Sequence, residues 1–302
     1  MQSTGTSANP ASATFSLRAH LELMRPANMV TALADVLAGF AVAGLVNPEK
    51  LPWLLAAGLM LYAGGVTMND FFDRRLDAVE RPERPIPSGR VSAPGAGLLG
   101  ITLLLAGVAC AFRAATVSGA IAGAVALLAV SYDAVFKHIP LAGPIAMGSC
   151  RGLDLLLGVS ANPDALAVRW YVAAIPLAYI AGVTLLSAGE VHGGSRPRAW
   201  ISVALLALAA MGSLFMGASS AVRIASVCVL LALLAWRVGP AFYRACLNPD
   251  APHIRAAIRA GVISLVFLDG SVAAAWQGLW YALGLVALVM IASYLARLFP
   301  VE

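Results

Sequence analysis

Four side chains with oxygen donors follow one another at helical spacing near residue 70. They are Asn69, Asp70, Asp73 and Asp77, within the stretch Asn-Asp-Phe-Phe-Asp-Arg-Arg-Leu-Asp. If this stretch is helical, the three aspartates share one face, because residues three, four and seven apart lie above one another. Carboxylates held this close repel each other, and a divalent cation would remove the repulsion. Mg²⁺ prefers oxygen ligands and commonly bridges one or two carboxylates to a phosphate, so the spacing predicts a Mg²⁺ site.

A rigid basic loop follows the acidic residues. Residues 81–90 are Arg-Pro-Glu-Arg-Pro-Ile-Pro-Ser-Gly-Arg, and the prolines restrict the backbone. Guanidinium groups match phosphate oxygens in pairs, so Arg81 and Arg84 beside the carboxylates predict a metal–diphosphate site. The alternative is a solvated helix end, whose acids pair with Arg74, Arg75 and Arg81, followed by a loop that is basic only because it faces the cytoplasm.

The composition indicates a membrane protein. The chain has 302 residues, of which 60% are hydrophobic and 12% are charged. Soluble proteins carry about 45–50% apolar and about 25% charged residues. This difference excludes a soluble domain, a disordered chain and a nucleic-acid-binding protein. The net charge of +5 is therefore assigned to contact with a membrane surface, and the lipid bilayer is an expected partner.

Ten apolar runs approach the length of about 20 residues that crosses a hydrocarbon core. They lie near 28–46, 51–69, 95–113, 115–132, 140–160, 168–189, 199–217, 220–239, 256–275 and 279–298. Only Trp276-Gln277-Gly278 separates the last two runs, so nine spans with a re-entrant or tilted piece is the alternative to ten. The sequence predicts an all-α membrane protein, a bundle of nine to ten transmembrane helices. Residues 1–14 are predicted to be a disordered tail, and 15–302 a single polytopic domain.

The basic residues are distributed unequally between the two ends of the predicted spans. With a cytoplasmic N-terminus and ten spans, 15 of the 20 basic residues lie on the cytoplasmic side and 4 on the other. This asymmetry follows the positive-inside rule. The longer links 70–94, 190–198 and 240–255 fall on the same side. We therefore expect a multi-pass protein of the cell (inner) membrane with its active site on the cytoplasmic side.

Three motifs together match one known family. Asn69-Asp70-x-x-Asp73-x-x-x-Asp77 is followed by Arg81-Pro82-x-Arg84-Pro85-Ile86-Pro87-Ser88-Gly89, Arg25-Pro26-x-Asn28 opens the first run, and Tyr-Asp-Ala-Val-Phe-Lys at 132–137 ends the fourth. These elements resemble the signatures of the UbiA superfamily of intramembrane prenyltransferases. The resemblance covers about residues 20 to 275.

The resemblance implies a fold, a reaction and site residues. Members of the superfamily are bundles of nine transmembrane helices around a central cavity open to the cytoplasmic side and to lipid. They use Mg²⁺ to transfer an isoprenyl group from a prenyl diphosphate to a small acceptor. Carried over by position, Asn69, Asp70, Asp73 and Asp77 would hold the Mg²⁺–diphosphate, and Arg25, Asn28, Arg81, Arg84 and Lys137 would bind the donor. Asp70, Asp73, Asp77, Tyr132 and Lys137 form the expected catalytic set, with Tyr132 near the reacting carbon, where its ring stabilises a developing cation.

The second acidic motif of the superfamily is depleted in this chain. The corresponding stretch, 187–196, contains a single acid, Glu190, which is expected to ligate metal, with His192 as a poorer ligand or a proton acceptor. The alternative is that both are ordinary interfacial polar residues. Glu-Val-His-Gly-Gly at 190–194, with Cys-Arg-Gly-Leu-Asp at 150–154, resembles the EboC-like branch of the superfamily, whose acceptor the sequence does not name.

Charged residues also lie inside the apolar runs. Arg151 and Asp154 are three residues apart in the fifth run, where an isolated charge is costly, so they are expected to pair with one another or to face a cavity. Both are predicted to bind the acceptor, and a purely structural ion pair is the alternative. Asp35, Asp133 and Asp269 also need partners, and Asp133 is a candidate base on the acceptor side.

The predicted function is therefore Mg²⁺-dependent prenyl transfer by an enzyme of the UbiA type. Its partners are a prenyl diphosphate donor, an unknown small acceptor and the bilayer, with no nucleic acid. One alternative is a membrane carrier or transporter of a prenylated or lipid-linked molecule, because intramembrane charges line the path in many transporters. A non-catalytic UbiA-like protein is the other. A CDP-alcohol phosphotransferase is disfavoured, because residues 70–90 lack the pattern of that family.

Overall fold

The computed structural model describes residues 16–299, and the tail expected at 1–14 lies outside them. Within 16–299 every regular element is a helix, and no strand occurs. The elements are α1 (Leu17–Met24), α2 (Pro26–Val42), η1 (Pro48–Lys50), α3 (Leu51–Glu80), α4 (Ala93–Ala114), α5 (Thr116–Ala134), η2 (Phe136–His138), α6 (Ala142–Val159), α7 (Pro163–Arg169), η3 (Trp170–Ala173), α8 (Ala174–Ser187), α9 (Arg196–Gly217), α10 (Ala221–Leu247), α11 (Ala251–Gln277) and α12 (Leu279–Leu298). The expected all-α fold is confirmed.

All ten predicted apolar runs fall on helices. Among the described residues, eight helical segments are long and apolar enough to cross a membrane. Two others fall short, α2 because it has 17 residues and α6 because Arg151 and Asp154 lower its hydropathy. Gly278, with φ of 82°, turns the chain between α11 and α12, which have 27 and 20 residues. The last two runs are therefore separate long helices, and the total number of spans stays a prediction.

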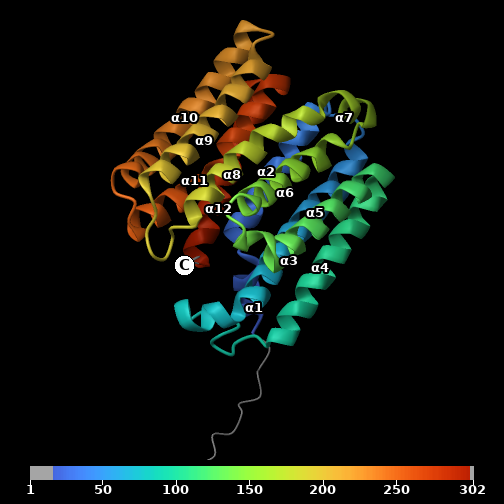
Figure 1. The fold of residues 1–302 in the computed structure, drawn as a ribbon. Coiled ribbons are helices and arrows are strands. Elements are labelled where there is room, and N and C mark those ends of the chain that lie inside the picture. The colour runs from blue at the N-terminus through green and yellow to red at the C-terminus, as the bar shows by residue number, and fades with distance from the viewer. Residues whose placement is uncertain (1–15, 300–302) are drawn as a thin grey trace, which may run out of the picture.

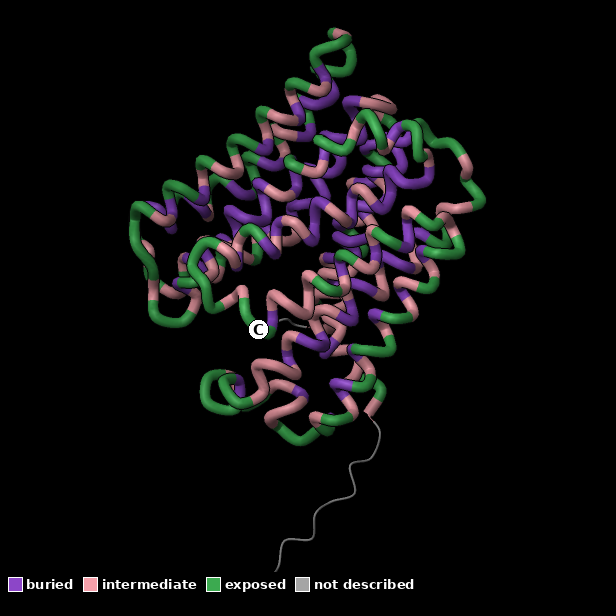
Figure 2. The backbone as a smooth tube through the Cα atoms, turned by 45° about the vertical axis from the view of Figure 1, so that its right-hand side comes forward, coloured by how far each residue is buried: buried purple, intermediate pink, exposed green. Residues whose placement is uncertain are grey.

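The helices form two groups that meet along the middle of the molecule. In Figure 1, α9–α12 lie on one side, α3–α5 lie on the other, and α2, α6 and α8 lie between them. The larger apolar core joins α2, α6 and α8 to α9–α12, and a smaller one joins α3–α5 to α2 and α6. Buried residues concentrate where the groups meet (Figure 2). Helices α2 and α6 contribute to both cores and therefore join the two groups.

Helices α2 and α6 touch through glycines at this meeting line. A Cβ atom at Gly39 would collide with the backbone at Leu155, Gly158 and Val159, and one at Gly158 would collide with the backbone at Val36 and Phe40. Small residues allow such close approach between membrane helices, where dispersion contacts and hydrogen bonds supply most of the association energy. The contact therefore holds α2 directly against α6.

We expect Gly39→Ala to destabilise the protein by about 1–3 kcal/mol, because the added methyl forces two backbones apart. The measurement is the thermal midpoint in detergent. Gly123→Ala on α5 is the matched control, because open space surrounds that position and alanine is the better helix former. Equal midpoints for the two variants would contradict the close contact.

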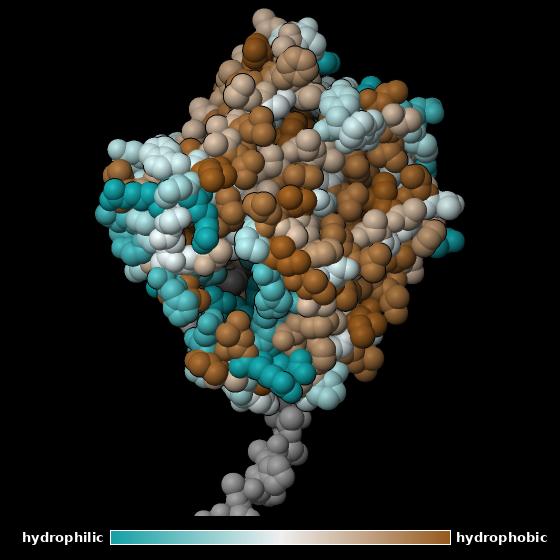
Figure 3. Space-filling model, in the orientation of Figure 1, coloured by the Kyte–Doolittle hydropathy of each residue, from teal (hydrophilic) through white to brown (hydrophobic). Residues whose placement is uncertain are grey.

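The links between helices collect the polar residues at one end of the bundle. We call the polar rim α1 together with residues 81–92, 188–195 and 248–250. Contacts tie its parts together: Arg90 pairs with Glu22, and the amide of Gly194 donates to the carbonyl of Pro249 at 2.8 Å. In Figure 3 hydrophilic residues gather at this end around a hollow, and hydrophobic residues cover most of the remaining surface in that view. A site open to charged molecules therefore lies at the rim.

Candidate active site

A central cavity of about 530 Å³ extends from the polar rim into the bundle. Its lining comes from α2, α3, α5, α6, α8 and α11, the loop after α3, and Ala296 of α12. Ten residues singled out in the sequence line it, namely Arg25, Asn28, Asn69, Arg81, Arg84, Tyr132, Asp133, Arg151, Asp154 and Glu190. Residues from seven helices and from the loops after α3 and α8 thus converge on one space with a polar mouth.

Helix α3 carries the acidic residues into the rim without a break. It continues to Glu80, so Asp70 and Asp77 lie on one face and are both buried. Asp70 receives the guanidinium of Arg25 at 2.6 Å and that of Arg84 at 3.3 Å. Arg84 also donates to Asp77 at 2.8 Å. Two arginines from separate segments therefore bracket this acidic face. Arg74, considered as a partner, instead donates to the carbonyl of Phe71 at 2.7 Å, and Arg75 is exposed.

The backbone at Arg25 directs its side chain to the site. Arg25 lies between α1 and α2 with φ of 51°, in the left-handed region that costs a non-glycine residue about 1 kcal/mol or more. The turn lets Pro26 start α2 and sends the guanidinium towards Asp70. Burial lowers the pKa of Arg25, but the Asp70 carboxylate raises it, and the pKa lies above its ordinary value. Arg25 is thus a permanent cation at the rim.

The loop after α3 holds Arg84 by local hydrogen bonds. The amide of Ser88 donates to the carbonyl of Arg84 at 3.0 Å, and that of Val91 donates to Pro85 at 3.0 Å. Gly89 has φ of 75°, which glycine adopts without strain. These turns and the prolines keep the loop compact, so that Arg84 reaches back to α3.

A second network joins α3 to the end of α5. The amine of Lys137, in η2, donates to Asp73 at 2.5 Å. The Asn69 amide donates to Asp73 at 3.2 Å and to Asp133 at 2.8 Å. Tyr132, next to Asp133, also lines the cavity. The Tyr–Asp…Lys element and the acidic motif, 64 positions apart, are therefore neighbours.

Glu190 faces the same cavity from the link between α8 and α9. Its carboxylate pairs with Arg81 at 3.2 Å, and its backbone carbonyl accepts from Arg255 at 3.1 Å. His192 is exposed and is absent from the cavity lining. Across residues 16–299 no three Asp, Glu, His or Cys side chains gather as a metal-ligand group. The predicted ligands are thus divided among three clusters in which acids pair with basic side chains. They are Asp70 with Asp77, Asp73 with Asn69, and Glu190.

Buried charges form the floor of the cavity. Arg151 binds Asp35 at 2.7 Å and Thr31 at 2.8 Å, and lies 3.6 Å from Asp154. Its nearest carboxylate is thus on α2, and the expected pairing with Asp154 is the longer of two contacts. Asp269 of α11 is also buried, and both of its carboxylate oxygens lack hydrogen-bond partners within residues 16–299. The Arg151 guanidinium therefore connects α6 to α2 at the centre of the bundle.

Two cavity residues were not anticipated. Arg255 and Arg259, one turn apart on α11, line the mouth opposite α3. Their spacing, Arg-x-x-x-Arg at the start of an apolar run, places both on one helical face. This spacing was the sequence feature that could have predicted that they line the same site. The sequence assigned them only to the basic side of the membrane.

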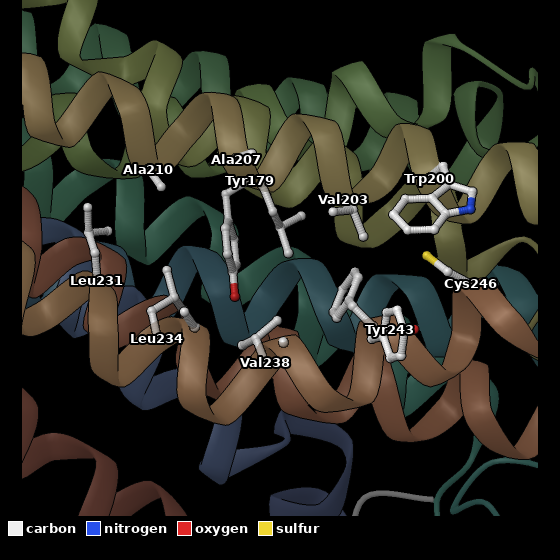
Figure 4. Close-up of a pocket in the computed structure, with 14 residues that line it drawn as sticks. Tyr179, Trp200, Val203, Ala207, Ala210, Leu231, Leu234, Val238, Tyr243 and Cys246 are labelled. Atoms are coloured by element: carbon white, nitrogen blue, oxygen red, sulfur yellow. The ribbon is translucent and has the colours of Figure 1, made fainter.

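A second, apolar pocket of about 220 Å³ lies among α8, α9 and α10 (Figure 4). Its lining contains no charged side chain, and the hydroxyl of Tyr179 is already bonded to the carbonyl of Gly261 at 2.9 Å. The pocket therefore lacks the groups that would hold a diphosphate or move a proton.

The fold and the site define a class: a multi-pass membrane protein with a cavity whose mouth carries paired acids and bases and whose interior is largely apolar. Comparison with known proteins identifies the family. Residues 29–192 match the UbiA prenyltransferase family. The chain belongs to this family.

Several relatives share part of the sequence. The digeranylgeranylglyceryl phosphate synthase of Methanothrix thermoacetophila is 40% identical over 149 residues, which cover 48% of this chain and 56% of that protein. The synthase of the same name from Ignicoccus hospitalis is 37% identical over 148 residues, covering 49% and 48%. The chain therefore spans about half the length of the curated relatives it matches.

Solved structures share the fold at low sequence identity. The apo structure of a UbiA homologue from Aeropyrum pernix K1 has a TM-score of 0.68 at 16% identity, covering 80% of this chain and 96% of that one. A UbiA homologue from Archaeoglobus fulgidus, bound to GPP and Mg²⁺, has a TM-score of 0.58 at 15% identity, covering 94% and 100%. These likenesses show the fold.

Proposed function

We propose that the protein transfers an isoprenyl group from a prenyl diphosphate to a small acceptor within the membrane, in a Mg²⁺-dependent reaction. The observation that carries this proposal is the charged cluster beside the cavity, where Asp70 and Asp73 pair with Arg25, Arg84 and Lys137. Arg25 and Arg84 line the cavity, whereas Asp70, Asp73, Asp77 and Lys137 are not among its lining residues. The match to the UbiA prenyltransferase family, relatives named digeranylgeranylglyceryl phosphate synthase and a homologue bound to GPP and Mg²⁺ support it.

Basic residues that now hold carboxylates would receive the diphosphate. Arg25, Arg84 and Lys137 each contact an aspartate of α3 at 2.5–3.3 Å. Their donors would bind the phosphate oxygens and stabilise charge on the leaving group. The carboxylates would then be free to accept a metal ion.

The oxygen donors of α3 fit Mg²⁺. Asn69, Asp70 and Asp73 offer only oxygen ligands, and no group of three acids closes around one point among the described residues. Mg²⁺ keeps several waters and needs only one or two carboxylates plus phosphate, so Asp70 and Asp73 would hold it, with Asn69 and Asp77 supporting them. Mg²⁺ would act as a Lewis acid on the diphosphate oxygens. Glu190, paired with Arg81 in the link between α8 and α9, would hold a second ion.

The chain's apolar wall would hold the prenyl tail and exclude water. Leu61, Val66, Val125 and Ala129 line the cavity, and each buried CH₂ contributes about 0.8 kcal/mol. During transfer, the bond between C1 and the diphosphate oxygen breaks, and its electron pair leaves with diphosphate. A pair from the acceptor forms the new bond to C1, and the acceptor releases a proton. Tyr132 would face the developing cation, and Asp133 would accept the proton.

The floor of the cavity would orient the acceptor. Arg151 and Asp154 line it, and Arg151 Nη1 and Asp154 Oδ1 are buried without hydrogen-bond partners. Buried polar atoms normally find partners, so an acceptor hydroxyl or carbonyl would satisfy them. The stretch at 190–194 supports assignment to the EboC-like branch, and the concentration of arginines at the rim supports a rim that faces the cytoplasm of the cell (inner) membrane.

The test uses purified protein in detergent with radiolabelled geranyl diphosphate and a panel of acceptors. We expect Mg²⁺-dependent release of diphosphate with the matching acceptor, and no release after EDTA treatment. Calorimetry with pyrophosphate should show binding that requires Mg²⁺, because the carboxylates repel the anion without it. Release that continues in EDTA would contradict the metal role. In proteoliposomes, movement of a prenylated molecule without bond cleavage would favour the carrier alternative.

A further inference from the structure

The apolar pocket of Figure 4 is a groove that runs along α9 and α10, and we call it the α9–α10 groove. None of its lining residues lines the central cavity. In Figure 4, Trp200 and Tyr243 lie at one end of the groove, and Ala210 and Leu231 lie at the other. From Trp200 to Ala210 the lining follows about 15 Å of helix, at 1.5 Å per residue. The groove therefore has about half the length of a bilayer's hydrocarbon core, which is about 30 Å thick.

The end of the groove nearest the polar rim carries an arginine without an acidic partner. Arg196 is the first residue of α9, and it shares a helical face with Trp200, one turn further on. Its Nε donates to the carbonyl of Leu247, at the end of α10, at 3.1 Å. Within residues 16–299 Arg196 makes no ion pair, and no Asp or Glu occurs between 191 and 249. The terminal nitrogens of this exposed guanidinium are therefore free to bind an anion.

Two exposed aromatic side chains flank the same end. Trp200 is 51% exposed and Tyr243 is 58% exposed. In the described part of the chain, neither the indole N–H nor the phenol hydroxyl has a hydrogen-bond partner. Trp and Tyr concentrate where hydrocarbon meets the lipid headgroups, because their rings are apolar and their tips are polar. With Arg196 beside them, they indicate that the groove starts at headgroup depth and ends near the middle of the bilayer.

The length and the charge of the groove select its occupant. A partner transmembrane helix has to cross the whole hydrocarbon core, so a groove of half that length does not seat one. The acyl chain of a lipid crosses only one leaflet. A lipid without net charge would leave Arg196 without a counter-charge, whereas basic pockets between membrane helices bind anionic headgroups.

We propose that the α9–α10 groove binds one anionic phospholipid, with its phosphate on Arg196 and one acyl chain along the groove. Guanidinium donors bind phosphate oxygens through charge-assisted hydrogen bonds. Val203 and Leu234 line the part that receives the chain. The lipid is a bound partner and not a substrate. The site does not depend on the proposed function, because it shares no residue with the central cavity.

The test counts bound lipid by native mass spectrometry. The full chain in detergent is mixed with phosphatidylglycerol or with phosphatidylcholine at matched concentrations. We expect one phosphatidylglycerol to stay bound, with an affinity about tenfold or more above that of phosphatidylcholine, the effect of one charge-assisted contact. Arg196→Gln should lower the phosphatidylglycerol affinity to that of phosphatidylcholine. Arg196→Lys should keep most of the affinity, because lysine also binds phosphate as a point charge.

Matched controls separate this site from general basicity and general apolarity. Arg198 lies two residues further along α9, on another face of the helix, so Arg198→Gln should leave phosphatidylglycerol binding unchanged. Ala207→Trp fills the groove and should abolish that binding, whereas Ala204→Trp, on the same helix but outside the lining, should not. All four variants should still bind Mg²⁺ with geranyl thiodiphosphate, an unreactive donor analogue, as the wild type does, because the central cavity is unchanged.

Five outcomes would overturn the inference. Equal affinities of the wild type for the two lipids, unchanged phosphatidylglycerol affinity in Arg196→Gln, or an equal loss in Arg198→Gln would each remove the role of Arg196. Displacement of phosphatidylglycerol by inorganic phosphate would assign Arg196 to a free anion. Wild-type dimers that Ala207→Trp converts to monomers would assign the groove to a second copy of the chain.

Discussion

Replacing Asp73 with asparagine should lower diphosphate release from a prenyl diphosphate on the order of a thousandfold while the protein stays folded. Asp73 accepts from Lys137 at 2.5 Å and from Asn69 at 3.2 Å, so it joins the basic and amide donors of the site. Asparagine keeps the shape but removes the charge that Mg²⁺ needs. Loss of one electrostatic contact that acts on the leaving group costs about 10²–10³-fold in rate, and loss of a metal ligand adds to it.

The fold should tolerate this change because the Asp73 side chain is only partly buried. Its side chain is 22% exposed, and ion pairs that reach solvent contribute about 0–1 kcal/mol. The measurement pairs diphosphate release with calorimetric binding of Mg²⁺–pyrophosphate. Glu80→Gln is the control, since Glu80 lies on the same helix, is exposed, and makes no side-chain hydrogen bond or ion pair within residues 16–299. Wild-type release and binding in Asp73→Asn would refute the metal role of the α3 acids.

Replacing Arg151 with leucine should destabilise the protein by about 3–5 kcal/mol, enough to leave little folded protein in the membrane. Arg151 is the cation for Asp35 and Asp154, and Asp269 is a further buried acid of the bundle. All four groups are buried. Removing one partner of a buried ionic cluster leaves uncompensated charge, which has this cost in proteins.

A companion variant keeps that prediction testable if Arg151→Leu fails to fold. Combining it with asparagine at Asp35, Asp154 and Asp269 removes every charge of the cluster, and should recover most of the stability, because neutral replacement of a whole buried cluster is often tolerated. Folded yield and thermal midpoint in detergent are the measurements, with Arg223→Leu on exposed α10 surface as the control. If Arg151→Leu alone were as stable as wild type, the cluster would not stabilise the bundle.

The local pattern of apolar and polar residues was sufficient to predict the membrane helices of the fold. Each of the ten apolar runs is helical because, in hydrocarbon, a helix satisfies its own backbone hydrogen bonds. The acid spacing at 69–77 placed the polar face correctly because α3 continues through it to Glu80. The motif at 25–28 also marked a real boundary, where Arg25 separates α1 from α2.

Pairing between distant segments was decided by the tertiary structure. The sequence offered Arg74, Arg75 and Arg81 as partners for the acids, yet Arg25 and Arg84 hold Asp70. Asp154 was the expected partner of Arg151, yet Asp35, on another helix, lies closer. Sequence neighbours were favoured because spacing within one helix is known in advance, whereas distances between helices depend on how the whole bundle packs.

The sequence by itself determined that the protein is a helical membrane bundle with an acidic and a basic motif near one end, because hydropathy and helical period are local properties. Only the tertiary structure decided that Arg255 and Arg259 of α11 line one cavity with Glu190. Arg25 and Arg84, which pair with the α3 acids, line the same cavity. Glycine contacts, such as that of Gly39 with α6, determine which faces of neighbouring helices pack against one another. Such contacts act between residues more than a hundred positions apart, and no local pattern contains them.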